Sequence, residues 1–320
     1  MDKKNVSDTF TIRIERLVYG GAGLGRPGGK VVFVPFSVPG DTLLVRPVEE
    51  KKSFIRAAAL EVLEPGPGRI DPACPHFGVC GGCHWQQIDY ARQVETKRLI
   101  LEELLHHKFP GTAPLPVAMR PSPRPFGYRS RARVQFAGAG AGAVVGFFRG
   151  GSHAILDIDH CPLFRPSLNE ALKALRLSRR SPDAGREPGE IDIACSEEEG
   201  AWSAGPGEVL RRKVGGFTYR LTADVFFQAN DFLVEELAGL VDAAAGDCDP
   251  DAALDLYAGV GLFSLPLARR FRKVVAVEGS PSACRLQRSN AAEAGFGHLR
   301  TVCADVAGWM EGAEAHDFDL

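Results

Sequence analysis

The chain has 320 residues, and 45% of them are hydrophobic. At about 150 residues per domain we expect about two domains with a large buried core, which excludes intrinsic disorder. The sequence contains no run of about 18 apolar residues, and its N-terminus lacks the apolar segment of a signal peptide. We therefore expect a cytoplasmic protein without a membrane partner, whose eight cysteines are reduced thiols.

The charges are divided unevenly along the chain. Residues 1–150 contain 21 Lys and Arg against 13 Asp and Glu, a net charge of +8. Residues 151–320 contain 17 against 27, a net charge of −10. A basic half beside an acidic half indicates an anionic partner at one end of the chain.

The N-terminal part has the pattern of a small β-barrel. Short apolar stretches alternate with glycines in residues 10–63, which predicts about five short strands. The stretches are residues 11–17, 31–33, 42–48 and 58–63.

A cysteine-rich loop follows at residues 71–85. Cys74, Cys80 and Cys83 form a C-x5-C-x2-C pattern, and a fourth sulfur ligand would complete either a zinc site or a cubane iron–sulfur site. The candidates for the fourth ligand are Cys161, Cys195, Cys248, Cys284 and Cys303. Cys161 is preferred because it lies outside the predicted cofactor sheet, in a turn-like setting. Because zinc sites more often contain two CxxC pairs, the spacing modestly favours iron–sulfur.

The middle of the chain gives weaker signals. A helix is predicted for residues 89–107 with Asp89 as its N-cap. The alternating run at 128–136 predicts a strand with three arginines on one face, which either contacts nucleic acid or is simply solvated. These arginines are Arg129, Arg131 and Arg133. The region up to residue 219 is predicted to be mostly β, with a polar stretch at 178–190.

The C-terminal part alternates strands with helices, which predicts a parallel, doubly wound sheet. The expected strands are residues 252–256, 273–277 and 299–303, and the expected helices are residues 231–245, 262–271 and 282–294.

A glycine turn follows the first of these strands. It contains Gly259 and Gly261, but Ser264 replaces the third glycine of a dinucleotide-binding motif. Asp255, Glu278 and Asp305 stand near the ends of the three successive strands. Carboxylates in these places suit S-adenosylmethionine (SAM), which offers an amino group, ribose hydroxyls and an adenine amine.

Two aromatic residues and two amides precede this sheet, at residues 226–230. Phe226, Gln228 and Asn230 could stack on and hydrogen-bond to RNA bases, or they could belong to the core and a helix cap.

Together these patterns resemble the uridine-C5 RNA methyltransferase family, in particular the iron–sulfur type that modifies 23S ribosomal RNA. The resemblance covers the whole chain. It implies an RNA-binding TRAM β-barrel at 8–64, a mostly β central domain with an iron–sulfur loop at 71–220, and the N-terminal part of a SAM-dependent methyltransferase domain at 221–320.

The resemblance also implies roles for particular residues. The ligands of a [4Fe-4S] cluster would be Cys74, Cys80, Cys83 and Cys161. The SAM site would comprise Gln228, Asp255, Tyr257, Gly259, Gly261, Glu278 and Asp305. Phe226 would stack on RNA bases, Arg131 would reach the target nucleotide, and Arg129 and Arg133 would contact RNA beside it. The protein is expected to be monomeric.

In this family a cysteine thiolate adds to uracil C6, C5 then takes the methyl group from SAM, and a base removes the C5 proton. The nucleophile stands in a Cys-Asn-Pro motif, and no cysteine here is followed by Asn-Pro. The segment 316–320 resembles the start of a fourth strand. We therefore expect a C-terminally truncated and inactive methyltransferase without its nucleophile and base.

Two other functions remain open. A radical-SAM RNA-modifying enzyme also combines cysteines with SAM, but its usual loop is C-x3-C-x2-C. A non-catalytic RNA-binding module with a structural zinc would need the cysteines without the chemistry.

Overall fold

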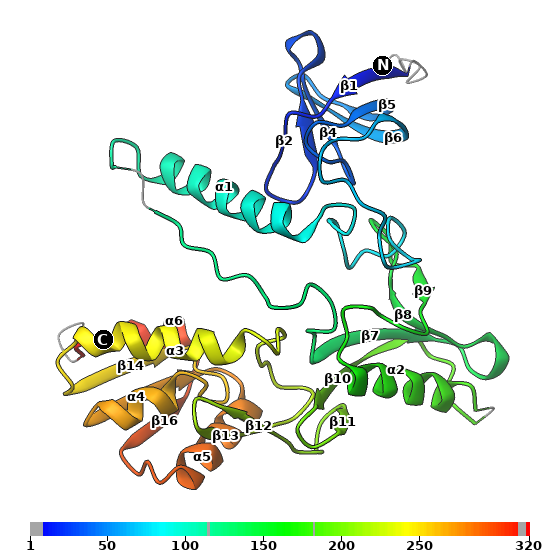
Figure 1. Ribbon diagram of the computed structural model, residues 1–320. Helices are drawn as coiled ribbons and strands as arrows, with labels where there is room; N and C mark the ends of the chain where they lie inside the picture. Colours follow the sequence, from blue (N-terminus) through cyan, green and yellow to red (C-terminus); the bar gives the residue numbers. More distant parts are fainter. Residues whose placement is uncertain (1–8, 114–115, 182, 313–317) are drawn as a thin grey trace. The chain divides into compact units, whose positions relative to one another are not determined.

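The computed structural model describes residues 9–113, 116–181, 183–312 and 318–320 (Figure 1). The chain divides into two compact units. The first comprises the residues up to 121 together with 147–156, and the second comprises 122–146 and 157–320. In the described part of the chain, no helix combines the length and the apolar character that crossing a membrane requires.

The first unit contains a six-stranded sheet with strand order β1-β5-β6-β4-β3-β2. The strands are β1 (Phe10–Arg13), β2 (Arg16–Leu17), β3 (Gly23–Gly25), β4 (Val31–Val34), β5 (Thr42–Glu50) and β6 (Phe54–Glu64). Alternate residues of these strands are buried, among them Ile12, Val32, Val34, Leu43 and Val45. The stretch 11–17, expected as one strand, is two strands, because Ile14 and Glu15 donate to Asp41 and Leu24 instead.

The cysteine-rich loop follows β6 and is fastened to this sheet by Asp41. The Asp41 side chain is fully buried and accepts hydrogen bonds from the amides of Val38 and Gly66. Arg69, just before the loop, forms a two-pronged ion pair with the same carboxylate at 2.5 and 2.9 Å. After the loop, α1 (Tyr90–Lys108) begins at its predicted N-cap, since the Asp89 carboxylate accepts from the Arg92 amide.

The second unit begins with the central sheet, in the order β11-β10-β7-β8-β9. The strands are β7 (Arg131–Ala137), β8 (Val144–Phe148), β9 (Ile155–Asp157), β10 (Gly189–Ser196) and β11 (Ala201–Ala204). The hairpin tip of β8 and β9, residues 147–156, belongs to the first unit. A two-stranded ribbon follows, β12 (Leu210–Val214) with β13 (Phe217–Leu221).

The sequence did not predict α2 (Pro166–Arg179), which interrupts the region expected to be mostly β. The helix begins with Pro166 in its first turn, where proline is tolerated. It buries Leu168, Ala171 and Leu172, which are spaced three and four residues apart and pack on the central sheet. The helical period was therefore present, but only in three of the fourteen residues of the helix.

The C-terminal part contains the predicted parallel sheet, in the order β14-β15-β16. The strands are β14 (Ala252–Leu256), β15 (Lys273–Glu278) and β16 (Leu299–Cys303), and the helices are α3 (Val234–Ala244), α4 (Ser264–Arg270), α5 (Pro281–Glu293) and α6 (Val306–Met310). The predicted alternation of strands and helices is confirmed, to within three residues at each boundary.

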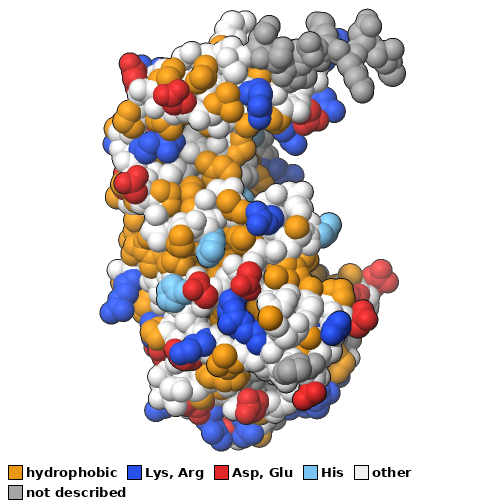
Figure 2. Space-filling model, turned by 90° about the vertical axis from the view of Figure 1, so that its right-hand side faces the viewer, with side chains coloured by type: hydrophobic (Ala, Val, Ile, Leu, Met, Phe, Trp, Pro, Cys, Tyr) orange, Lys and Arg blue, Asp and Glu red, His pale blue; other side chains and the backbone are white. Residues whose placement is uncertain are grey.

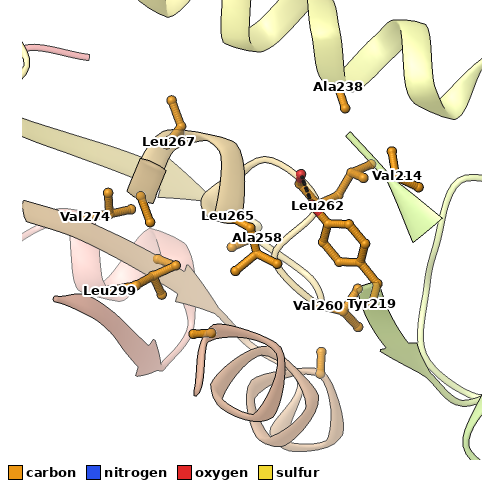
Figure 3. Packing of buried hydrophobic residues seen from close by; sticks show 14 of the residues in the cluster. Val214, Tyr219, Ala238, Ala258, Val260, Leu262, Leu265, Leu267, Val274 and Leu299 are labelled. Carbon is orange, nitrogen blue, oxygen red and sulfur yellow. Dashed lines mark hydrogen bonds between the residues drawn. The ribbon is translucent and has the colours of Figure 1, made fainter. Parts of the chain in front are cut away.

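The apolar core of this sheet also includes side chains of the β12–β13 ribbon (Figure 3). Tyr219 of β13 is fully buried, and its hydroxyl donates to the carbonyl of Leu262 at 3.0 Å. Leu262 lies in the turn between β14 and α4. The ribbon and the parallel sheet therefore share one core.

The last described residues run beside β14. Leu254 donates to the carbonyl of Leu320 at 2.8 Å, and Asp319 donates to the carbonyl of Ala252 at 2.9 Å. Residues 318–320 are not assigned as a strand, so the fourth strand stays a prediction. The part of that segment at 316 and 317 lies outside the described residues.

Candidate functional site

The turn between β14 and α4 has an unusual backbone. Tyr257, Gly259 and Gly261 all have positive φ angles, of 58°, 57° and 92°. A tyrosine rarely adopts this conformation, and strain of this kind tends to occur at functional sites. The side chain of Tyr257 is also 75% exposed. At Gly261 an added Cβ would lie 3.2 Å from Cγ of Gln287, so the turn needs glycine there.

Glu278, at the end of β15, ties two loops together. One of its carboxylate oxygens accepts from the Gly259 amide at 2.9 Å, and the other accepts from the Ser280 amide at 2.7 Å. An ionised carboxylate has about four acceptor positions. The two amides leave room for further donors, such as the hydroxyls of a ribose.

Asp255, in β14, is directed into the protein. It is only 8% exposed, and it accepts a 2.5 Å hydrogen bond from the Ser264 hydroxyl. Burial raises the pKa of Asp255 to about 6, although the hydrogen bonds from Ser264 act in the opposite direction. Gln287, which is fully buried, donates to the same hydroxyl at 3.2 Å. This carboxylate therefore supports the turn from the protein interior. Its contact with SAM stays a prediction.

The remaining predicted SAM residues lie at two further places. Asp305, two residues beyond β16, is exposed and caps α6 by accepting from the Gly308 amide at 2.8 Å. Gln228 is half-buried in the loop between β13 and α3. The carboxylates of Glu278 and Asp305 thus lie at or just beyond the carboxyl ends of adjacent strands, as the sequence predicted.

Arg131 and Phe226, which the sequence marked separately as RNA contacts, lie together. The guanidinium carbon of Arg131 is 5.3 Å from the centre of the Phe226 ring, within cation–π distance. Arg131 also donates to the carbonyl of Ala223 at 3.3 Å, and burial lowers its pKa. The Phe226 ring is 64% exposed. An exposed aromatic ring backed by a guanidinium group can stack on an unpaired base.

The two neighbouring arginines have other partners. Arg129 donates to the carbonyl of Arg131 at 2.9 Å. Arg133 is exposed and pairs with Asp192 at 2.9 Å and Glu190 at 3.2 Å. On the face seen in Figure 2, Lys and Arg side chains are scattered among Asp and Glu side chains. On this face, net charge alone therefore does not mark an RNA-binding surface.

The four predicted cluster ligands belong to both units. Cys74, Cys80 and Cys83 lie in the loop of the first unit, where burial raises the pKa of Cys80. Cys161 lies in the second unit, in a turn held by Asn169 of α2, which accepts from the Cys161 amide at 2.9 Å. Among the described residues, no three His, Cys, Asp or Glu side chains form a group that could hold a metal ion.

The sequence did not reveal the buried polar residues that support the glycine turn. Besides Ser264 and Gln287, these include Asn290, which donates to the carbonyl of Val260 at 3.0 Å and accepts from the Arg220 amide at 2.8 Å. Gln287 and Asn290 share the buried face of α5 with Ala283 and Ala291. Polar residues at helical spacing among buried small residues were the available signal.

We predict that Asp255→Asn stabilises the fold above pH 6 and not near pH 4. A pKa of about 6 instead of 3.8 means that folding favours the protonated form. The stabilisation is therefore present below pH 4 and is lost as the pH rises through 6, at a cost of about 3 kcal/mol. Asparagine removes the charge while its oxygen still accepts from Ser264. Thermal unfolding at pH 4 and pH 8 measures the difference.

Asp251→Asn is the matched control, because Asp251 is an exposed carboxylate at the opposite end of β14. It should show no comparable gain at pH 8. A destabilised Asp255→Asn protein at pH 8 would contradict the assignment of Asp255 as a buried, unfavourably ionised group.

Comparisons with known proteins identify the family. A family model described as tRNA (Uracil-5-)-methyltransferase matches residues 207–305, which include the glycine turn, Glu278 and Asp305. The 23S rRNA (uracil(1939)-C(5))-methyltransferase of Alkalilimnicola ehrlichii is 30% identical, over 93% of this chain and 77% of the relative. An uncharacterised RNA methyltransferase of Synechocystis is also 30% identical, over 88% of this chain and 73% of the relative.

The fold is shared with a solved structure. The tRNA (uracil-54, C5)-methyltransferase of Pyrococcus abyssi, in complex with S-adenosyl-L-homocysteine, matches with a TM-score of 0.71. The match has 22% sequence identity and covers 92% of this chain and 79% of the other. With relatives at 30% identity along most of their length and a family model over the glycine turn, the chain belongs to the uridine-C5 RNA methyltransferase family.

Proposed function

We propose that this chain binds SAM at the carboxyl ends of β14, β15 and β16, as part of an enzyme that forms 5-methyluridine in 23S ribosomal RNA. The observation that carries the proposal is the link between Glu278 and the Gly259 amide, which joins the glycine turn to the end of the next strand. In parallel sheets of this kind, ligands bind at such strand ends. The relatives that act on 23S rRNA support the choice of RNA. The enzyme would act in the cytoplasm as a monomer.

Each residue of the site has a distinct part in this proposal. The unused acceptor positions of Glu278 would receive the ribose hydroxyls, while Gly259 and Gly261 let the backbone approach the ligand. Tyr257 would contribute its exposed ring and Gln228 its amide, and Asp305 would accept from the remaining donors. Asp255 would hold the turn in place.

The reaction needs more than this site. SAM supplies the methyl group when bound. Because uracil C5 is a poor nucleophile, a thiolate must first add to C6, and a base must later take the C5 proton. We assign the thiolate and the base to no residue of this sequence. Cys284 is buried on α5 and Cys303 is exposed at the end of β16, and neither is followed by the Asn-Pro of the family's nucleophile motif.

RNA would be bound by two parts of the chain. We propose that residues 8–64 act as the TRAM domain of the family, that residues 71–220 form the central domain, and that residues 221–320 carry SAM. Phe226 would stack on an unpaired base, and Arg131 would face the target nucleotide. A target base has to leave its stack before its ring can be attacked.

We predict that Gly261→Ala weakens the binding of S-adenosylhomocysteine about tenfold or more, the loss expected for one misplaced polar contact. Alanine is strained at a φ of 92°, and its Cβ would press on Gln287. Glu278→Gln, which removes the charge, should have an effect of similar size. Isothermal titration calorimetry measures both.

Gly239→Ala in α3 is the control, because a Cβ there meets nothing within 4 Å. It should bind like the unmodified chain. If Gly261→Ala and Glu278→Gln also bind normally, the ligand site is not at this turn.

We predict that Arg131→Ala weakens the binding of a uridine-containing 23S rRNA fragment about tenfold, in line with the 1–3 kcal/mol typical of base stacking on proteins. The control is Arg272→Ala, which makes the same change of charge at an exposed residue just before β15, far along the chain from Arg131. It should weaken binding less than about twofold. Filter binding at several salt concentrations measures both.

Equal losses in the two variants would mean that RNA is held by net charge alone. Tighter binding of a transfer RNA than of the 23S fragment would contradict the choice of 23S rRNA but not the family.

We also propose that Cys74, Cys80, Cys83 and Cys161 hold a [4Fe-4S] cluster. Four thiolates complete such a site, three of them share one loop, and Cys161 lies in an ordered turn. We predict that anaerobically purified protein contains iron and sulfide, and that Cys161→Ala loses them whereas Cys248→Ala does not. Zinc without iron or sulfide would contradict the cluster and favour a structural metal site.

A further inference from the structure

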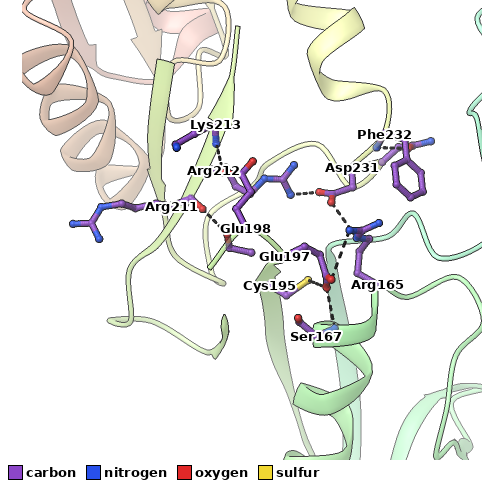
Figure 4. Close-up of polar contacts among 12 residues, drawn as sticks. Arg165, Ser167, Cys195, Glu197, Glu198, Arg211, Arg212, Lys213, Asp231 and Phe232 are labelled. Carbon is purple, nitrogen blue, oxygen red and sulfur yellow. Dashed lines mark hydrogen bonds and ion pairs between the residues drawn. The ribbon is translucent and has the colours of Figure 1, made fainter. Parts of the chain in front are cut away.

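A group of buried charged side chains surrounds Asp231, which follows the loop that carries Phe226 and Gln228 (Figure 4). The side chain of Asp231 is 8% exposed and lies between two arginines. Arg212 of β12, itself 7% exposed, binds one of its oxygens, and Nε of Arg165 lies 3.2 Å from the other. Arg165 also pairs with Glu197 at 3.6 Å. The two arginines and two carboxylates balance in charge.

The loop itself has little structure of its own. Residues 222–233, between β13 and α3, form neither helix nor strand, so side chains and single backbone contacts must fix its path. The Ser130 amide donates to the carbonyl of Ala229 at 3.0 Å, and the Asp231 amide donates to the carbonyl of Tyr128 at 2.8 Å. Asp231 directly follows the 226–230 motif, and its side chain and backbone attach the end of the motif to neighbouring segments.

The residues around Asp231 also contact three other segments of the second unit. Arg165 precedes α2, and its amide donates to the carbonyl of Arg129 at 2.9 Å. Phe232, the next residue after Asp231, has Arg165 at 4.9 Å and Arg124 at 5.4 Å from its ring centre. The ribbon, the start of α2 and the segment before β7 therefore all meet at Asp231.

Stability alone gives a poor reason for this arrangement. Desolvating buried charges often costs as much as their attraction returns, and well-packed apolar residues can replace such pairs without loss of stability. Burial lowers the pKa of Arg212, whose Nε atom is buried without a hydrogen-bond partner among the described residues. The Nε atom of Arg165 lies at ion-pair distance from Asp231 but does not form a hydrogen bond with it. What the charges do provide is a fixed direction for the Asp231 carboxylate, because a guanidinium group donates in a rigid planar geometry.

We propose that Asp231 is a positioning residue, which Arg165 and Arg212 grip so that the 226–230 loop presents Phe226 to RNA and Gln228 to SAM. The identity of these two ligands rests on the proposed function, whereas the grip on the loop does not. The opposite side of the loop is fixed by packing, since the rings of Phe227 and Tyr219 are 6.1 Å apart in the core. On the other side of the loop, the ion pairs of Asp231 with Arg165 and Arg212 hold the backbone in place.

The test replaces the ion pair by apolar residues, in the double variant Asp231→Leu with Arg212→Met. Arg165 then keeps Glu197 as its partner. Three quantities are measured: the melting temperature, the affinity for S-adenosylhomocysteine, and the fluorescence of a Phe226→Trp reporter placed in each background. Position 226 is exposed, so the emission of the indole depends on how the loop holds it relative to solvent and to neighbouring side chains.

We expect a melting temperature close to that of the parent, because apolar replacement of a buried pair is often neutral. We expect S-adenosylhomocysteine to bind about tenfold more weakly, as for one misplaced hydrogen bond, and the emission of the reporter to shift. The matched control is Asp157→Leu with Arg176→Met, which removes the ion pair between β9 and α2. The control should change neither the affinity nor the emission of the reporter.

Unchanged affinity and unchanged reporter emission in a stable double variant would overturn the proposal. If the double variant unfolds, Asp231→Glu decides. It keeps the charge but displaces the carboxylate by one methylene, so it should fold and still shift the emission, and an unshifted emission would refute the positioning role. Gln228→Ala separates the two hypotheses, because normal binding by that variant removes Gln228 from the SAM site while the reporter still tests Asp231.

Discussion

The hydrogen bond between the Gly259 amide and Glu278 holds the candidate site together. It spans 19 residues and joins the turn after β14 to the end of β15, so that a strained turn and a carboxylate lie beside the proposed SAM position. The buried hydrogen bonds of Ser264, Gln287 and Asn290 beneath the turn hold its other side. The positive φ angles at Tyr257 and Gly259 persist because these contacts constrain the turn.

The proposed RNA-binding side depends on a different kind of interaction. Phe226 and Arg131 come from segments some ninety residues apart, as the contact of Arg131 with Ala223 shows, and they meet because short backbone contacts bring residues 128–131 beside the loop. Ion pairs to Asp231 hold that loop from behind. Tyr219 connects the two sides, since its ring packs near Phe227 and its hydroxyl binds the turn at Leu262. The two proposed ligand positions thus share one core.

Much of this could be predicted from local patterns. β14, β15 and β16 are short apolar runs bounded by polar or turn residues, and the sequence predicted them almost residue for residue. The N-cap Asp89 and the glycine turn were likewise local signals. The helix α2 was missed because only three of its fourteen residues are buried, which leaves a weak apolar pattern. The grip of Arg165 and Arg212 on Asp231 could not be predicted, because it depends on how distant segments pack, and no local pattern marks the three residues as neighbours.

Hydrogen exchange with and without S-adenosylhomocysteine tests the central claim most directly. The ligand should slow the exchange of amides in residues 255–261 and 278–280, where the turn and Glu278 would enclose it, and in residues 226–230 through the shared core. The six-stranded sheet of residues 10–64 should exchange at the same rate in both states. Slower exchange confined to that sheet, or no change at the turn while the ligand is bound, would contradict a SAM site at the ends of β14 and β15.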